Sequence, residues 1–433
     1  MPWPAGAVLV GGAVRDALLG RGATDLDWLV EDPELSAKQH AEALHGSPFL
    51  MDPVRRHWRV VLAGGVTHDF VPLRAGASNI EEDMWLRDLT VNAIALPQDG
   101  AVFDPTGGLE DLQRQRVRMT SRDSLRADAV RPLRAVRFAA TLAFELDEET
   151  KEAVVAQFEA QRTGSAPLPA WERVSTELQA LLAARSAARG FTLLKALGGL
   201  ALYLPELELG RGVKQGALHH LDVLDHQLES LNQLLNGFPD AGPALRWATL
   251  MHDVGKPASV GRTPLGSPTF YGHDKTGAEM TREALRRLRL PNEVVDHASA
   301  LVRYHMLPLP REERAVRRFV HRRKALLPDL LKLMLADREA ARGRAASVAG
   351  RQAYRISVSG VLAEMEEQPP VVPLLNGDDV MQLLDLDPGP NIGEALAVVA
   401  EAQAVGDVKN REEAAALLHR YAAAQGWQLA QRS

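Results

Sequence analysis

The sequence predicts a small α+β domain with a mixed sheet at its N-terminal end, followed by a remainder that is helical. The first observation is composition: 433 residues with 46% hydrophobic and 24% charged side chains are typical of a soluble globular chain. The second is that short apolar runs alternate with helical stretches between residues 7 and 96. The third is that strand signals nearly vanish after Asp111, where apolar residues recur at the i, i+3, i+4 and i+7 spacing of helices. At roughly 150 residues per domain, we expect about three domains.

The N-terminal alternation predicts strands and helices in turn. Strands are expected over residues 7–12, 25–30, 58–64 and 66–74, and helices over 14–20 and 36–46. Farther along, helical periodicity is clearest over residues 125–144, 171–197 and 221–238. Stretches rich in proline and glycine at residues 167–169, 210–216, 261–268 and 367–373 predict boundaries or long loops.

Composition excludes several kinds of site. The sequence contains no cysteine, so disulfides, thiolate zinc sites, iron–sulfur clusters and cysteine nucleophiles are impossible. Any metal must therefore be bound by histidines and carboxylates. No window approaches the roughly 20 continuous apolar residues of a membrane span, and the start MPWPAGAVLV lacks the basic and long apolar regions of a secretory signal. We expect a cytoplasmic protein with no membrane partner.

Positive charge is concentrated in two places despite a net charge of −6. Eight arginines lie between Arg114 and Arg137, and a second run extends from Arg303 to Lys324. A solvated helix face is the ordinary explanation for any one of these residues. Two dense runs are harder to explain in that way, so the net charge does not exclude a nucleic-acid partner.

The segment VLVGGAVRDALLGRGATDLDWLV places a strand, a Gly-Gly turn, a short helix and two carboxylates in that order. Asp25 and Asp27 alternate on the second strand, so its period of two puts both on one face. Two close carboxylates repel each other unless a divalent cation neutralises them, and Mg²⁺ prefers carboxylates plus substrate phosphates. Gly11 and Gly12 allow backbone N–H groups to approach a triphosphate.

Joined in this order, these residues resemble the signature of the DNA-polymerase-β-like nucleotidyltransferases, specifically the class II tRNA nucleotidyltransferases and bacterial poly(A) polymerases. The resemblance continues in register down the chain to Leu178. Four further motifs carry it: LRDLTVNAIA at Leu86–Ala95, FDPTGGLEDLQRQRVR at Phe103–Arg118, DAVRPLRAVRFAA at Asp128–Ala140 and ERVSTEL at Glu172–Leu178.

The resemblance implies that an RNA 3′-hydroxyl attacks the α-phosphate of a nucleoside triphosphate while pyrophosphate leaves. It makes Asp25 and Asp27 the catalytic residues and the ligands of Mg²⁺. The nucleotide-binding residues that it implies are Gly12, Arg15, Arg87, Asp88, Asn92, Asp128, Arg131, Arg134 and Arg137. Among them, Asp128 and Arg131 resemble the pair that reads the Watson–Crick edge of the incoming base, since a carboxylate accepts from an amine and a guanidinium donates to ring acceptors. Asp69 is a candidate third carboxylate, with a structural role as the equal alternative.

Three departures from the family pattern affect this prediction. Ala127 stands where the family has Glu, so another residue must brace the pair of Asp128 and Arg131, and Leu86-Arg87 replaces a double arginine. Only twelve residues, AGASNIEEDMWL, separate Arg74 from Arg87. In family members that build the whole CCA end, this interval is longer and holds a flexible loop that reorients the base-reading pair. The short interval favours CC addition from CTP, because a rigid pocket cannot fit both cytosine and adenine; complete CCA addition from CTP and ATP is the alternative.

A second group of candidate ligands lies in the middle of the chain, where seven of the thirteen histidines fall between His219 and His305. On predicted helices or at their ends lie His226, His252, Asp253, His273, His305 and Asp337. A helical bundle can converge such residues on one ion. We expect ordinary core or surface roles for the remaining histidines of this part, namely His219, His220, His297 and His321.

This order of ligands resembles the HD superfamily of metal-dependent phosphohydrolases over residues 218–341. The resemblance implies that His226, His252, Asp253 and Asp337 bind a divalent metal, that His273 and His305 hold a second ion or a phosphate, and that Lys256 neutralises the phosphate. Imidazole ligands favour Ni²⁺, Mn²⁺, Co²⁺ or Zn²⁺ over Mg²⁺. The implied reaction removes 2′,3′-cyclic phosphates or 2′-phosphates from RNA ends, and a remnant kept as scaffold is the alternative.

The two resemblances predict four parts. They are a catalytic head over residues 1–120, a helical neck with the base-reading helix over 121–210, an HD domain over 211–345 and a helical RNA-binding tail over 346–433. The expected substrates are tRNA and CTP, with ATP in the alternative. Poly(A) addition is disfavoured by the HD ligands. An HD enzyme whose first domain only binds RNA is disfavoured by the intact Asp25, Asp27, Arg87 and Asp88.

Overall fold

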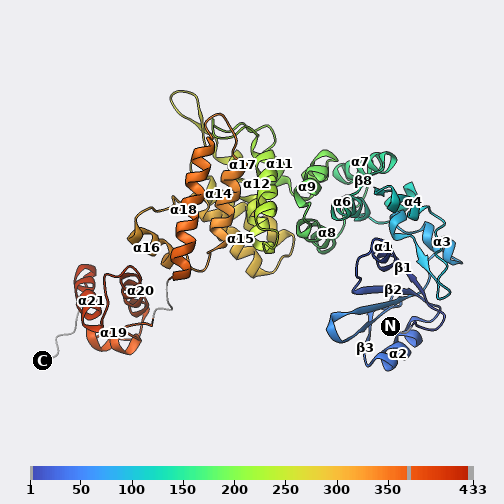
Figure 1. The fold of residues 1–433 in the computed structure, drawn as a ribbon, viewed down its shortest axis with the longest axis horizontal. Coiled ribbons are helices and arrows are strands. Elements are labelled where there is room, and N and C mark those ends of the chain that lie inside the picture. Colours follow the sequence, from blue (N-terminus) through green and yellow to red (C-terminus); the bar gives the residue numbers. More distant parts are fainter. Residues whose placement is uncertain (1–2, 368–371, 428–433) are drawn as a thin grey trace. The chain divides into compact units, whose positions relative to one another are not determined.

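The computed structural model describes residues 3–367 and 372–427. They divide into two compact units (Figure 1). Unit 1 extends to Leu209 and includes Ala284–Leu290, and unit 2 comprises Gly210–Glu283 and the residues from Pro291 onward. None of the described helices combines the length and the apolar character that crossing a membrane requires. The finer division into four parts at residues 120, 210 and 345 stays a prediction.

Unit 1 begins with a six-stranded sheet of order β3-β4-β5-β2-β1-β6 (Figure 1). The strands are β1 (Val8–Val10), β2 (Asp25–Leu29), β3 (Ser47–Asp52), β4 (His57–Val61), β5 (Thr67–Val71) and β6 (Ala95–Leu96). β2 runs parallel to β5, whereas the other neighbouring strands are antiparallel. The predicted mixed sheet is therefore confirmed.

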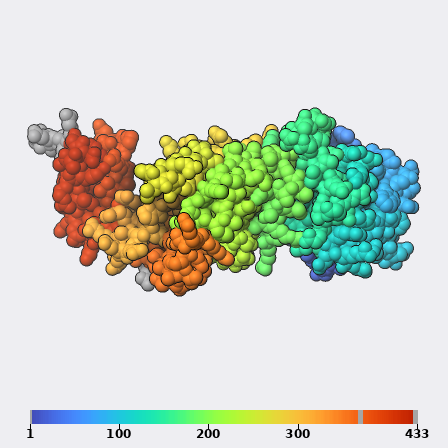
Figure 2. Space-filling model, turned by 90° about the horizontal axis from the view of Figure 1, so that it is seen from above, coloured from blue at the N-terminus to red at the C-terminus, as the bar shows by residue number. Residues whose placement is uncertain are grey.

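The rest of unit 1 is almost entirely helical. Its helices are α1 (Gly12–Leu18), α2 (Pro33–Leu44), α3 (Ile80–Trp85), α4 (Gly108–Gln113), α5 (Arg122–Arg126), α6 (Arg131–Leu142), α7 (Glu148–Thr163), α8 (Trp171–Ala183), α9 (Ala187–Ala196), α10 (Gly199–Tyr203) and α11 (Pro205–Glu208), with a small sheet of β7 (Arg116–Val117) and β8 (Glu145–Leu146). α6 buries Leu133, Val136 and Ala140 and packs against α7, α8 and α9. The outer surface of these helices is teal to green in Figure 2. Apolar residues at helical spacing thus place α6 in the middle of this layer.

Unit 2 is a helical bundle with a short hairpin. Its elements are α12 (Val223–Gly237), α13 (Pro243–Met251), β9 (Gly261–Arg262), β10 (Pro268–Thr269), α14 (His273–Arg287), α15 (Asn292–Tyr304), α16 (Glu313–Arg323), α17 (Asp329–Ala340), α18 (Val348–Glu367), α19 (Gly377–Leu384), α20 (Pro390–Ala404) and α21 (Arg411–Gln425). α14 ends in residues that belong to unit 1. Asp222 caps α12 by accepting from the N–H of Asp225, and α12 packs against α13 and α17.

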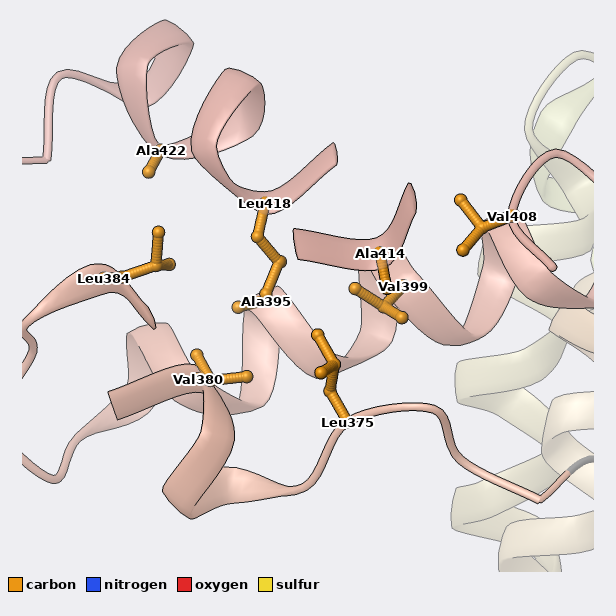
Figure 3. Packing of buried hydrophobic residues seen from close by; sticks show 9 residues of the cluster. All are labelled: Leu375, Val380, Leu384, Ala395, Val399, Val408, Ala414, Leu418 and Ala422. Carbon is orange, nitrogen blue, oxygen red and sulfur yellow. The ribbon is translucent and has the colours of Figure 1, made fainter. Parts of the chain in front are cut away.

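The last three helices share a small apolar core (Figure 3). Val380 of α19, Ala395 and Val399 of α20 and Leu418 of α21 are buried together in it. Asn376 and Asn410 cap α19 and α21 with their side chains. Residues 428–433 of the expected tail lie outside the described residues.

Two elements differ from the sequence-based expectation. β3 carries Phe49, Leu50 and Met51 at 42%, 45% and 46% exposure, so this edge strand lacks the alternation that reveals a half-buried strand. Residues 261–268, expected as a boundary or loop, include the two short strands of the β9–β10 hairpin. The break expected over residues 367–373 falls mostly outside the described residues.

Candidate functional site

The first candidate site lies on β2, where Asp25 and Asp27 share one face. In the parallel register, Asp27 stands opposite Asp69 of β5, so a third carboxylate is adjacent. Arg59 binds both oxygens of Asp69, at 2.6 and 2.7 Å, and the ring of His57 lies 3.2 Å away. Burial favours a higher pKa for Asp69, but Arg59 and His57 outweigh it and hold that pKa at about 2. Because its charge is already balanced, Asp69 suits a structural role better than a metal-binding one.

Asp25 and Asp27 differ from Asp69 in having no ion pair among the described residues. The hydroxyl of Thr67 donates to Asp25. Burial, and then the charge of Asp69, raise the pKa of Asp27 above its ordinary value. Two hard oxygen donors without an ion-pair partner among the described residues fit a divalent cation such as Mg²⁺.

Gly11 brings the backbone close to this pair. It lies at φ 75°, and a Cβ atom there would stand 3.2 Å from Nη1 of Arg87 and 3.3 Å from Oδ2 of Asp27. A larger residue would be strained and would fill the space between the carboxylate and the guanidinium. Gly12, the first residue of α1, faces the guanidinium of Arg15 at 3.5 Å from its would-be Cβ.

The predicted nucleotide-binding residues near Gly12 meet in one buried network. Nη1 of Arg15 donates to Oδ1 of Asn92 at 2.6 Å, and the Asn92 side-chain amide donates to Asp88 at 3.5 Å. Arg87 donates to the backbone carbonyl of Asn92 at 3.4 Å. Burial lowers the pKa of Arg87 to about 10, so it remains a cation at neutral pH.

The arginines of α6 are braced by a residue that sequence analysis did not single out. Arg134 donates to Asp88 at 2.7 Å and to Glu177 at 3.1 Å, and Arg137 donates to Glu177 at 2.5 Å. Burial favours a raised pKa for Asp88, but Arg134 outweighs it and holds that pKa at about 2. Glu177 lies in the ERVSTEL motif, and this membership was the sequence signal from which its role could have been inferred.

The expected base-reading pair is held from two sides. Arg173 of the same ERVSTEL motif donates to both oxygens of Asp128, at 2.8 and 2.6 Å. Arg131 donates to the carbonyls of Leu86 at 3.1 Å and Ser124 at 2.6 Å. Arg173 therefore provides the brace that Ala127 cannot. Asp128, Arg131 and Arg173 line a cavity of about 710 Å³ together with Asp88 and Arg134.

The short interval between Arg74 and Arg87 contains α3 in its second half. Its carboxylate Asp83 is fully buried and accepts from the Arg74 side chain at 2.7 Å and from the Arg87 side chain at 3.0 and 3.1 Å. Asn79 caps the helix by accepting from the N–H of Glu82 at 2.9 Å. Both ends of the interval are thus tied to one carboxylate, which leaves little freedom for rearrangement.

The second candidate site gathers side chains from five helices or their ends in unit 2. Asp253 lies at its centre: Oδ2 faces Nε2 of His252 at 3.3 Å and of His226 at 3.7 Å. Oδ1 of Asp253 faces Nε2 of His273 at 3.4 Å and of His305 at 3.7 Å. Two ligand groups with metal-binding spacing, His226–His252–Asp253 and Asp253–His273–His305, therefore share this carboxylate.

Asp337 of α17 completes the first group, with Oδ1 2.8 Å from Nε2 of His226 and 3.7 Å from Nε2 of His252. Lys256 lies 2.6 Å from Oδ2 of Asp253, so in this structure it neutralises that carboxylate. The six ligand residues expected from the sequence are brought together.

The ring orientations of three histidines fit metal ligation. Nδ1 of His252, His273 and His305 lies 2.7–2.8 Å from the carbonyl of Thr249, Phe270 and Val302 respectively. A neutral ring with Nδ1–H donating to a carbonyl presents the lone pair of Nε2, the arrangement typical of metal-binding histidines. Nε2 of His252 is buried and has no hydrogen-bond partner among the described residues.

Without an ion, the two carboxylates of this cluster favour the protonated form of His252. Burial favours a lower pKa for His252, but Asp253 and Asp337 outweigh it and raise that pKa to about 10. Buried imidazoles around two carboxylates fit a divalent transition metal, which would replace the protons.

The histidines expected to be ordinary have varied surroundings. His219 lies edge-on against His226 with ring centroids 4.4 Å apart, and burial lowers its pKa to about 4. His297 lies 3.1 Å from Asp329. His219 thus contacts the cluster, and nothing in its sequence surroundings indicated this contact.

Most arginines of the two basic runs have acidic partners. Arg116 and Arg118 bind Asp111, while Arg318 and Arg322 bind Glu401. These pairs reduce the charge that either run offers to phosphates.

The fold and the two sites define a nucleotidyltransferase that carries an HD domain. The chain matches the poly A polymerase head domain over residues 65–118 and the HD domain over residues 223–342. It is 52% identical to the A-adding tRNA nucleotidyltransferase of Deinococcus radiodurans over 97% of this chain and 96% of that protein. It is 46% identical to the CC-adding tRNA nucleotidyltransferase of Thermus thermophilus over 96% of this chain and 93% of that protein.

A solved structure agrees with these relatives. The CCA-adding enzyme of Bacillus stearothermophilus in complex with CTP is 26% identical and superposes with a TM-score of 0.64, covering 97% of this chain and 94% of that one. The chain belongs to the family of tRNA nucleotidyltransferases. The family expected from its motifs is confirmed.

Proposed function

We propose that this tRNA nucleotidyltransferase adds cytidines from CTP to the 3′ end of tRNA, and that its HD cluster hydrolyses phosphoesters at RNA ends. The observation that carries the first part is the double clamp on the nucleotide pocket. Asp83 ties both ends of the short interval, and Arg173 fixes Asp128. A pocket held in this way suits one size and donor pattern of base.

Different residues of unit 1 have different roles in the nucleotidyl transfer. Asp25 and Asp27 would hold Mg²⁺, which when bound neutralises charge on the reacting phosphate. The turn at Gly11 leaves room for the triphosphate, and the Arg87 guanidinium stands beside it. The 3′-oxygen of the RNA forms a bond to the α-phosphorus, the bond from that phosphorus to the pyrophosphate oxygen breaks, and the proton of the 3′-hydroxyl passes to water.

The base is selected in the cavity of about 710 Å³ that Asp128 and Arg131 line. Asp128 accepts from an exocyclic amine while Arg131 donates to ring nitrogen and carbonyl acceptors. Arg134 and Arg137 are fixed by Glu177, so the helix that carries Arg131 is anchored to α8.

The product of the reaction with both nucleotides tests the specificity. A tRNA that ends at its discriminator base is incubated with CTP and ATP together, and its new 3′ end is sequenced. We expect two added cytidines and no adenosine. A CCA end formed in the same time would contradict the proposal.

Adenosine addition is the second candidate, because the relative named A-adding is 52% identical while the relative named CC-adding is 46% identical. Overall identity to these two relatives therefore does not show whether the chain adds adenosine or cytidine. A tRNA that already ends in CC separates them: an A-adding enzyme extends it with ATP and leaves a tRNA without CC unextended by CTP.

The HD cluster is proposed to open a 2′,3′-cyclic phosphodiester or to remove a 2′-phosphate. A divalent transition metal on His226, His252, Asp253 and Asp337 would supply a water of lowered pKa. Hydrolysis of the cyclic substrate forms a bond between a water oxygen and phosphorus, breaks the bond from phosphorus to one ribose oxygen, and moves a proton from the water to that ribose oxygen. Hydrolysis of 2′,3′-cyclic AMP in the presence of Ni²⁺, Co²⁺ or Mn²⁺ tests this; its absence with all of these ions would favour a scaffold.

A further inference from the structure

A cavity of about 330 Å³ lies where α17 ends and α18 begins, and its volume is at the small end of the roughly 300–1,000 Å³ of small-molecule sites. The residues that line it are Glu339, Arg342, Val348, Arg351, Gln352 and Arg355. Glu339 follows Asp337 by two positions on α17, so at about 100° per residue the two side chains leave this helix about 200° apart. Glu339 therefore faces away from the histidine and aspartate cluster, and the cavity is separate from that site.

Positive charge exceeds negative charge in the lining of this cavity. Nε of Arg355 donates to Oε1 of Glu339 at 2.8 Å, and Nε of Arg351 lies 3.8 Å from Oε2 of the same carboxylate. Arg342 donates to the backbone carbonyl of Glu339 at 3.3 Å and has no carboxylate partner in the part of the chain that the structure describes. With three guanidinium cations and one carboxylate, the lining carries a formal charge of +2. An anion is therefore the ligand that this lining favours.

Hydrogen-bond donors remain for such an anion. A guanidinium carries five N–H donors, and the contacts of Arg342 and Arg355 described above use only their Nε groups. The side-chain amide of Gln352 adds a further donor. Val348, the first residue of α18, also lines the cavity, so the partial positive charge at the start of this long helix lies beside it. Several independent features thus favour negative charge at one place.

We propose that this cavity binds a small phosphate dianion, supplied as inorganic phosphate or as the terminal phosphate of a monoester. Guanidinium groups bind phosphate oxygens through paired N–H donors, and a dianion balances the +2 charge of the lining. A phosphodiester within an RNA backbone fits less well, because it carries one negative charge and the chain continues on both sides of it. The inference depends on neither of the two reactions proposed above.

Calorimetric titration of the full chain tests the cavity directly. Chelator is present, and the pH is about 8, where inorganic phosphate and methyl phosphate are dianions. Wild type, Arg342→Gln and Arg355→Gln are compared, so that the difference isolates this cavity from the nucleotide site, whose arginines also attract phosphate. Arg344→Gln is the matched control, because Arg344 is an exposed arginine of the same connection between α17 and α18 and does not line the cavity.

Arg342→Gln and Arg355→Gln should each weaken the binding of inorganic phosphate at least about tenfold, the size of a lost hydrogen bond to a charged group. Arg344→Gln should match the wild type. Glu339→Gln should act in the opposite direction and tighten phosphate binding, because it removes the carboxylate that competes for Arg355. A melting transition at the wild-type temperature checks that each variant is folded.

Two phosphate esters distinguish the sources of the ligand. Methyl phosphate that binds as tightly as inorganic phosphate supports a monoester end as the ligand, and weaker binding of methyl phosphate supports free phosphate. Dimethyl phosphate, a diester with the single charge of an RNA backbone phosphate, should bind at least about tenfold more weakly than inorganic phosphate. Equal binding of dimethyl phosphate would overturn the inference and assign the cavity to an RNA backbone. Wild-type phosphate affinity in both arginine variants, or no gain in a folded Glu339→Gln protein, would also overturn it.

Discussion

At the scale of single residues, the nucleotide site combines sequence neighbours with ion pairs between distant positions. Asp25 and Asp27 follow from a strand period of two, which is visible in five residues. Arg173 binds Asp128 across 45 positions, and Glu177 binds Arg137 across 40. Such partners depend on how α6 and α8 pack, and single-sequence periodicity gives the buried face of a helix without its neighbour.

The raised pKa of Asp27 leads to a test of activity and stability together. Asp27→Asn should reduce nucleotide addition at least about 100-fold, because losing a metal contact costs several kcal/mol. The pKa of Asp27 is raised, so its charged form disfavours the fold at neutral pH. With chelator present at pH 7, the variant should therefore melt no lower than the wild type, and the difference should vanish toward acidic pH, where Asp27 is protonated.

Asp99→Asn is the matched control for that variant, since Asp99 is an exposed loop residue that accepts only from the N–H of Ala101 among the described contacts. It should retain full activity. A stable Asp27→Asn protein with more than about a hundredth of wild-type addition would contradict the metal assignment.

The brace on Asp128 predicts a change in selectivity. Arg173→Ala frees the Asp128 carboxylate, which we propose reads the base, so discrimination between CTP and ATP should fall by about 1–3 kcal/mol while triphosphate binding changes less. The ratio of kcat/KM for the two nucleotides measures this. Arg162→Ala, which removes an exposed pair with Glu159, is the control. Unchanged selectivity in Arg173→Ala would show that other residues hold the base-reading pair.

At the scale of elements, the long amphipathic helices were predicted well and short exposed strands poorly. α12 follows from apolar residues at helical spacing, and its burial of Leu224, Leu228 and Leu231 agrees with that periodicity. β3 was missed because its consecutive apolar residues are exposed. The convergence of α12, α13, α14, α15 and α17 on the cluster around Asp253 required the order of ligands in a known family, because helix periodicity alone does not fix which helices meet.

This convergence predicts that metal stabilises unit 2 independently of any reaction. A divalent transition metal at 100 times its dissociation constant should add about 2.7 kcal/mol to the stability of the form that binds it. Calorimetric melting with Ni²⁺ or Mn²⁺, against chelator, should show a transition shifted upward by several degrees. The same ions should not shift the transition in His252→Ala, Asp253→Ala. An equal shift in that double variant would place the ion elsewhere.

At the scale of the whole molecule, two centres with different donor sets lie in separate units. Carboxylates alone form the first, and histidines with two carboxylates form the second. Because no residue is shared between them, each chemistry should be separable by substitution. The family, and with it the class of reaction, could be read from the motifs. The motifs do not show which nucleotide is added, since the relatives with 52% and 46% identity are named A-adding and CC-adding respectively.

The double variant His252→Ala, Asp253→Ala tests that separation. It should lose metal-stimulated hydrolysis of 2′,3′-cyclic AMP, because His226 and Asp337 alone give an ion too few ligands to bind tightly. Incorporation of CTP into a tRNA with a free 3′-hydroxyl should stay near the wild-type rate. A parallel loss of both activities in a protein that still folds would contradict the assignment of the two chemistries to separate units.

Single-turnover rates test most directly whether one clamped pocket serves one kind of base. CTP addition to a tRNA that ends at its discriminator base is compared with ATP addition to the same tRNA ending in CC, with enzyme in excess. We expect CTP addition to be at least about 100-fold faster, the discrimination expected of about two unsatisfied base contacts. Comparable rates for the two nucleotides would contradict it.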